Sequence, residues 1–208
     1  MKGNIVYFEE AKPENMDIVL DLVKEKAKEK GIKHVVVAST RGTTGVKAAE
    51  AFQETGIQIV VVTHQIGPRG PELLPENEEK IKAAGGKIVT CTHAFGGVGS
   101  SLRRVPPRVE GQARPAPYWP AYVPSTGGLI ANVLRLFSQG MKVCLEIAVM
   151  AADAGAIPIG ENVIAVGGQG RWADTAIIIK SANSTAFFDL DIGEILAKPI
   201  SKRIPRKE

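Results

Sequence analysis

Cysteine, aromatic residues and long apolar runs are all scarce in this 208-residue chain, and each scarcity argues against a class of protein. The two cysteines, Cys91 and Cys144, lie in no CxxC pair and in no cluster with histidine, so we predict no metal site. They fit a reducing compartment. The longest apolar run, residues 141–152, contains Lys142 and Glu146 and is shorter than the roughly 18 to 20 residues of a membrane span. With no signal-peptide pattern at the N-terminus, we predict a cytoplasmic protein without a membrane partner.

An excess of charge of one sign is also lacking, because the formal net charge is only +4. Much of this charge lies in residues 102–114 and in the tail 201–208. Isolated basic runs are usually solvated surface. A nucleic-acid-binding protein would carry a basic face on a recognisable module, and the sequence contains no such module. We therefore expect no nucleic-acid partner.

Apolar residues make up 44% of the chain, which is enough for a full core in a single domain spanning residues 1–208. Short β-branched runs alternate with helical patterns, and this alternation indicates βαβ units in an α/β fold with a parallel sheet. The expected strands are residues 33–40, 57–64, 86–93, 161–168 and 174–182. The expected helices are residues 14–30, 43–55, 75–84, 126–138 and 141–154. About seven residues join the last two strands, too few for a crossover, so the fifth strand should be antiparallel.

A proline-rich excursion at residues 105–124 interrupts this rhythm. Its proline density is incompatible with a central strand or a helix interior. Tyr118, Trp119 and Tyr122 distinguish it from a bare linker. One interpretation is an arm packed on its own domain. The other is a subunit contact, because aromatic residues are enriched at interfaces, and on this basis we expect a homo-oligomer.

The loops that follow the strands are where a ligand of an open parallel sheet binds. The loop after the first strand combines hydroxyl side chains, a glycine and an arginine at the start of a helix. Free N–H groups and the dipole at a helix start favour an anion, and arginine offers paired donors to phosphate oxygens. The alternative is an ordinary capped turn. The expected phosphate ligands are Ser39, Thr40, Arg41, Gly42, Thr43 and Thr44.

Two histidines end the second and third strands, and a glycine-rich loop follows the fourth. His64 and His93 should reach the same crevice, where they either contact a ligand or are satisfied polar groups. In the fourth loop the glycines either let a flat ligand approach or serve only a hairpin. The contacts we predict from these loops are His64, Gln65, Gly67, His93, Phe95, Gly167, Gly168, Arg171, Asp174 and Thr175.

Lys142 and Glu146 stand four residues apart in the most apolar expected helix. The simpler interpretation places them as a pair on the helix's single exposed strip. A buried carboxylate that faces a ligand is the alternative.

These loops resemble a known family. The stretches STRGTTG, VVVTH, THAFGGVG, QGMKVCLEIAVMAADAGAIP and VIAVGGQGRWADTA are similar to the mostly archaeal, uncharacterised pyruvate kinase α/β-domain-like proteins. The resemblance implies a three-layer α/β/α domain with a mixed five-stranded sheet of order 3-2-1-4-5, strand 5 antiparallel. It also implies bound flavin mononucleotide (FMN), with its phosphate on residues 39–44. The proline-rich stretch is longer than the family's usual link.

The resemblance leaves the reaction open. The leading hypothesis is a protein that binds a phosphate-bearing small molecule, FMN. One alternative is a non-enzymatic sensor of a sugar phosphate or nucleotide. The other is an enzyme acting on a phosphorylated metabolite, with His64 or His93 as its acid–base group.

Overall fold

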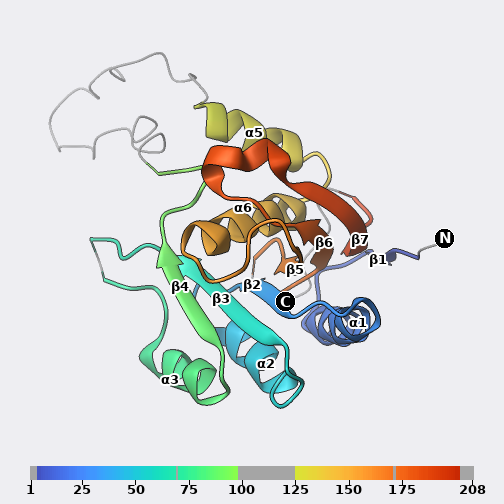
Figure 1. The fold of residues 1–208 in the computed structure, drawn as a ribbon, viewed down its shortest axis with the longest axis vertical. Helices are drawn as coiled ribbons and strands as arrows, with labels where there is room; N and C mark the ends of the chain where they lie inside the picture. The colour runs from blue at the N-terminus through green and yellow to red at the C-terminus, as the bar shows by residue number, and fades with distance from the viewer. Residues whose placement is uncertain (1–3, 69, 98–124, 171, 202–208) are drawn as a thin grey trace, which may run out of the picture.

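The computed structural model describes residues 4–68, 70–97, 125–170 and 172–201 (Figure 1). The proline-rich excursion 105–124 and Arg171 lie outside these ranges, so the predictions made for them stay predictions. Within the described residues, no helix is long and apolar enough to cross a membrane.

A seven-stranded mixed sheet forms the centre of the molecule, in the order β1-β7-β6-β5-β2-β3-β4. The strands are β1 (Val6–Phe8), β2 (His34–Ala38), β3 (Gln58–His64), β4 (Lys87–Cys91), β5 (Asn162–Gly167), β6 (Thr175–Lys180) and β7 (Asp191–Pro199). Only β6 runs against its neighbours, since it pairs antiparallel with both β5 and β7 while the other pairs are parallel. The α/β class and the antiparallel β5–β6 pair are therefore confirmed.

The expected five-stranded sheet is wrong, because β1 and β7 extend it at one edge. The order 3-2-1-4-5 thus does not describe the whole sheet, although the five expected strands are consecutive within it. Sequence patterns missed the two extra strands for different reasons. β1 has only three residues, and β7 includes aspartate, glycine, glutamate, lysine and proline, which are depleted in strands.

Helices cover both faces of the sheet (Figure 1). They are α1 (Glu14–Lys30), α2 (Thr43–Ala51), α3 (Pro75–Ala83), α5 (Thr126–Leu134) and α6 (Gln139–Asp153), with a 3₁₀ helix, η1 (Ser184–Asp189). Alternate residues of β2 point to opposite faces: Val35 and Val37 join the core under α1 and α2, and Val36 joins the core under α6. The buried runs expected for parallel strands therefore fill two separate cores.

Candidate functional site

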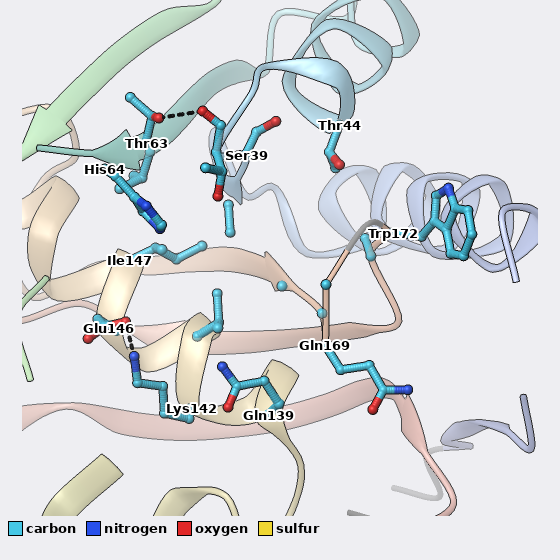
Figure 2. Close-up of a pocket in the computed structure, with 18 of the residues that line it drawn as sticks. Ser39, Thr44, Thr63, His64, Gln139, Lys142, Glu146, Ile147, Gln169 and Trp172 are labelled. Atoms are coloured by element: carbon cyan, nitrogen blue, oxygen red, sulfur yellow. Dashed lines mark hydrogen bonds and ion pairs between the residues drawn. The ribbon is translucent and has the colours of Figure 1, made fainter. Parts of the chain in front are cut away.

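A cleft of about 690 Å³ opens where the loops after β2, β3, β4 and β5 face α6. This volume lies in the range of roughly 300 to 1,000 Å³ typical of small-molecule sites. Ser39 and Thr44 lie on one side of the cleft, and Lys142 and Glu146 lie on the other (Figure 2). The cleft is therefore at the carboxyl ends of the parallel strands, as expected for this fold class.

Contacts to neighbouring elements fix the loop between β2 and α2. The buried Ser39 hydroxyl accepts a hydrogen bond from the Gly45 N–H at 3.0 Å. The Thr63 hydroxyl donates to the Thr40 carbonyl at 2.9 Å, and the Asn77 amide donates to the Arg41 carbonyl at 2.8 Å. In a trans peptide the C=O and N–H point in opposite directions. Holding the Arg41 carbonyl toward α3 therefore turns the following N–H away from α3.

The same loop keeps its donors open. Among the described residues, no protein group accepts a hydrogen bond from the backbone N–H of any residue from Thr40 to Thr44. The exposed guanidinium of Arg41 has no ion-pair partner there either. Unpaired N–H groups, a helix start and an arginine are the features that favour an anion, and here no protein contact would have to be given up to bind one.

Gly42 shapes this loop without lining the cleft. It has φ of 94° and precedes the first residue of α2. A Cβ at this position would lie 2.5 Å from the Asn77 Cβ and 2.7 Å from Leu73 Cδ1. The glycine is therefore required both by its left-handed backbone and by the close approach of α3.

The opposite wall carries a buried carboxylate. Glu146 Oε2 accepts hydrogen bonds from Lys142 and, at 3.0 Å, from His93 Nδ1. Glu146 Oε1 accepts the backbone N–H of Phe95 at 3.2 Å. The side chains of Lys142 and Glu146 are only 7% and 2% exposed, so the interpretation as an exposed pair is wrong. The alternative, a buried carboxylate in the cleft wall, is the arrangement observed.

The charge state of this group follows from its contacts. Burial alone raises the pKa of Glu146, but the hydrogen bonds from His93 and Lys142 outweigh burial and lower this pKa to about 2. Burial also lowers the pKa of the Lys142 ammonium, and the contact with Glu146 opposes that change. At neutral pH the carboxylate is ionised, and Lys142 and Glu146 form an ion pair.

A second histidine adjoins this group. The rings of His64 and His93 meet edge to face, with their centroids 4.4 Å apart. His64 Nδ1 lies 3.2 Å from Glu72 Oε1 at the surface. For both rings the described residues provide no hydrogen-bond partner to Nε2. The expectation that the two histidines reach one crevice is therefore confirmed, because both line the cleft.

An apolar stripe lies beside these polar groups on α6. Val143, Ile147 and Met150 follow one another at helical spacing and all line the cleft. Figure 2 shows Ile147 between the Ser39 side and the Glu146 side. A flat, partly apolar molecule could pack on this stripe while its polar ends reach either wall.

The structure brings most predicted residues to the cleft, but not all. The predicted residues in its walls are Ser39, Thr40, Arg41, Thr43, Thr44, His64, His93, Gly167 and Gly168. The predicted residues away from its walls are Gly42, Gln65, Gly67, Phe95, Asp174 and Thr175. Phe95 acts through its backbone N–H on Glu146, and its ring packs against Phe187.

Asp174 and Thr175 lie away from the cleft walls and contact each other and the loop between β5 and β6. Both are buried, and the Thr175 hydroxyl donates to Asp174 Oδ1 at 2.7 Å. Asp174 Oδ2 accepts the Gln169 N–H at 3.3 Å. These contacts close the loop between β5 and β6. The close approach of Gly140, where a Cβ would lie 2.0 Å from Thr175 Oγ1, seats α6 against this loop.

Sequence reasoning missed much of the α6 wall. Besides the apolar stripe, the residues not predicted as contacts include Gln139, Lys142, Glu146, Gln169 and Trp172. One signal was available in the sequence: Gln139, Lys142 and Glu146 recur at helical spacing on an otherwise apolar helix. Polar residues in a helix buried all round must face either one another or a cavity.

The fold and the site define an α/β protein with a cleft at the carboxyl ends of its parallel strands. No family model matches the chain. Among solved structures, O-ureido-L-serine synthase is 18% identical with a TM-score of 0.30, and the match covers 69% of this chain and 40% of that one. A variant of that synthase with O-ureido-L-serine bound is 20% identical, with the same TM-score and coverage. The chain thus spans about 40% of these proteins, and so low a TM-score supports no conclusion about fold or function.

Proposed function

We propose that the cleft binds a phosphate-bearing small molecule, FMN, with the phosphate at the start of α2. The observation that carries this proposal is the run of five unpaired backbone N–H groups from Thr40 to Thr44, beside the unpartnered guanidinium of Arg41 among the described residues. A phosphate dianion supplies enough acceptors for such a run, and the dipole of α2 favours its charge.

The rest of the cleft suits the rest of that ligand. The stripe of Val143, Ile147 and Met150 offers a surface for a flat ring, and Gly167 and Gly168 line the cleft without adding side chains to it. At the α6 end Lys142 offers hydrogen-bond donors, and Nε2 of His93 offers an acceptor. A bound flavin supplies redox capacity from its own ring, while the protein contributes placement and electrostatics. The sequence resemblance points to the same ligand.

A matched pair of ligands tests the proposal. Riboflavin has the ring and side chain of FMN but lacks the phosphate. We expect the fluorescence of FMN to be quenched when it binds the protein. We also expect FMN to raise the melting temperature of the protein. Riboflavin should bind at least tenfold more weakly, because the loop donors then have no anion to accept their bonds. Equal affinity for FMN and riboflavin would show that the phosphate does not contribute to binding. If neither molecule binds, the proposal of a flavin ligand is refuted.

Two further expectations stay predictions. The homo-oligomer rests on aromatic residues of the excursion 105–124, which lies outside the described residues. Light scattering after size exclusion would give the number of chains per particle. The cytoplasmic location rests on cysteine usage, and cell fractionation would test it.

A further inference from the structure

The α6 wall holds groups that phosphate binding does not use. Glu146 gathers His93 and Lys142 at one carboxylate oxygen, so the imidazole and the ammonium lie side by side in the cleft wall. We propose that this wall catalyses proton transfer at a carbon next to a carbonyl group. In this proposal His93 is the general base and acid, Lys142 binds the oxyanion, and Glu146 is the positioning residue.

The hydrogen bonds determine which nitrogen of His93 reacts. An ionised carboxylate only accepts hydrogen bonds, so the 3.0 Å contact with Glu146 places the proton on Nδ1 of His93. The Nε2 lone pair is then free, and no described residue occupies it. A carboxylate that orients an imidazole through Nδ1–H is the arrangement by which enzymes prepare a histidine base.

Lys142 supplies the complementary charge. Its ammonium has three N–H donors, and among the described residues the single hydrogen bond from this group goes to Glu146. The side chain is almost fully buried, yet it lines the cleft. A donor held in a low-dielectric wall stabilises developing negative charge more strongly than one in water. Because its Nζ is held by the hydrogen bond to Glu146, Lys142 acts in this proposal as a donor and not as a nucleophile.

The step balances without an oxidant or a reductant. His93 Nε2 takes the proton from the carbon, and the C–H electron pair becomes the C=C bond of an enolate. The carbonyl π pair moves to oxygen, where the Lys142 ammonium donates a hydrogen bond. Return of the proton to the same carbon completes an exchange. Return to the former carbonyl carbon completes an isomerisation when the proton of the neighbouring hydroxyl group moves to the former carbonyl oxygen. The substrate class is therefore a small carbonyl compound with an acidic C–H bond.

The carbonyl group can belong to the phosphorylated ligand itself or to a second molecule beside it. The inference rests on the proposed phosphate end only in the first case, and it does not depend on the flavin. Two probes separate the cases: dihydroxyacetone phosphate, which carries a phosphate, and dihydroxyacetone, which does not. If only dihydroxyacetone phosphate exchanges, the substrate binds through its phosphate to the loop before α2. Exchange of both, with no preference for the phosphorylated probe, places it at the α6 wall alone.

The experiment follows the α-protons of each probe by proton NMR in heavy water, using the full chain. We expect protein-dependent loss of the α-proton signal with at least one probe. His93→Gln should slow this exchange by about 100-fold or more, the usual contribution of a general base. The matched control is His34→Gln, since His34 lies at the start of β2, at the opposite end of that strand from the cleft. It should exchange at the wild-type rate.

The positioning role has a readout of its own. Nitrogen–proton correlation spectra report which ring nitrogen of His93 carries the proton. Wild-type protein should show the proton on Nδ1, and Glu146→Gln should remove that preference and slow the exchange. If Glu146→Gln does not fold, the wild-type spectrum alone still tests the positioning role of Glu146. A proton on Nε2 of His93 in that spectrum would refute it.

Two results would overturn the inference: no exchange of either probe above buffer, or wild-type exchange by folded His93→Gln. Neither outcome touches the phosphate proposal, because His93→Gln should retain the preference for FMN over riboflavin. Conversely, a wild-type protein that exchanges dihydroxyacetone but binds no FMN would refute the flavin and leave the proton-transfer site standing.

Discussion

The two walls of the cleft use their hydrogen-bonding capacity in opposite ways. The α2 wall leaves five backbone N–H groups and a guanidinium without acceptors among the described residues. The α6 wall centres on Glu146, whose two oxygens accept three hydrogen bonds from the protein. The first wall thus has donors without acceptors, while the carboxylate at the centre of the second is already paired with protein donors. A ligand in the cleft would add hydrogen bonds at the first wall and contact fixed, oriented groups at the second.

A second contrast isolates the effect of burial. Glu78 and Lys82 on α3 form the same kind of i, i+4 pair as Lys142 and Glu146 on α6, but their side chains are 42% and 63% exposed. The residue types and the spacing match, with the two charges in reverse order along the helix. Because that order changes the energy of an exposed pair by only a few tenths of a kcal/mol, larger differences in stability reflect what surrounds each pair. This comparison provides the largest predicted effect.

Glu146→Gln should destabilise the protein most. The change keeps the size of the side chain but leaves the Lys142 ammonium buried without its counter-ion, which costs about 3 to 5 kcal/mol. Urea denaturation followed by circular dichroism would measure the free energy of unfolding. Glu78→Gln is the control and should change it by about 0.5 kcal/mol or less. Equal losses in the two variants would show that burial of the α6 pair does not matter.

The pH dependence of stability should come next. The pKa of Glu146 is about 2 in the folded protein, below its ordinary value of 4.5. A lowered pKa stabilises the folded state above the unfolded pKa, and this stabilisation is lost as pH falls from about 4.5 to about 2. The loss should be about 3 kcal/mol. Denaturation at a series of pH values should show a smaller decrease for Glu146→Gln than for wild type over this window.

Gly42→Ala tests the shape of the open wall. The left-handed backbone and the overlap with Asn77 and Leu73 should together cost about 2 kcal/mol or more. FMN affinity should fall as well, because the loop must shift. Gly31→Ala is the matched control, since Gly31 has φ of 66° but open space around it, so only the backbone cost of about 1 kcal/mol remains. Equal melting temperatures for the two variants would contradict the crowding of Gly42.

Arg41→Ala should have the smallest effect on the protein and a specific effect on the ligand. The exposed side chain has no protein partner among the described residues, so stability should stay unchanged. FMN affinity should fall by about 1.5 to 3 kcal/mol, the worth of a charged hydrogen bond. Titration by fluorescence would measure it, with Lys33→Ala as the control cation before β2, at the far end of the strand from the cleft. Unchanged affinity would remove Arg41 from the phosphate site.

Sequence patterns predicted the elements whose own residues have a distinctive pattern. Buried β-branched runs such as Val35–Val37 identified the central strands, and the short link before Thr175 gave its strand direction. The loop at residues 39–44 was recognisable because hydroxyls, a glycine and an arginine meet at a helix start. The partners of single polar residues were not predicted. Asp174 resembled a ligand group, but it accepts hydrogen bonds from Gln169 and Thr175, close to it in the sequence.

The α6 wall shows why the rest could not be predicted. Lys142 and Glu146 form a plausible surface pair by spacing alone, and spacing says nothing about what packs over a helix. Their burial comes from the sheet below and from the loop that brings His93, 53 positions away from Glu146 along the chain. β7 was missed for a related reason, because its pairing with β1 and β6 overrides its weak strand propensity.

The short strand β1 has a consequence for the outer edge of the sheet. It pairs with β7 over three residues, from Val6 with Ala197 to Phe8 with Pro199, and Phe8 is buried in the core. Without it, β7 would present a free row of main-chain donors and acceptors to other molecules. A proteolysed form that begins after Phe8 would thus carry a strand template for self-association, even though its cleft is intact.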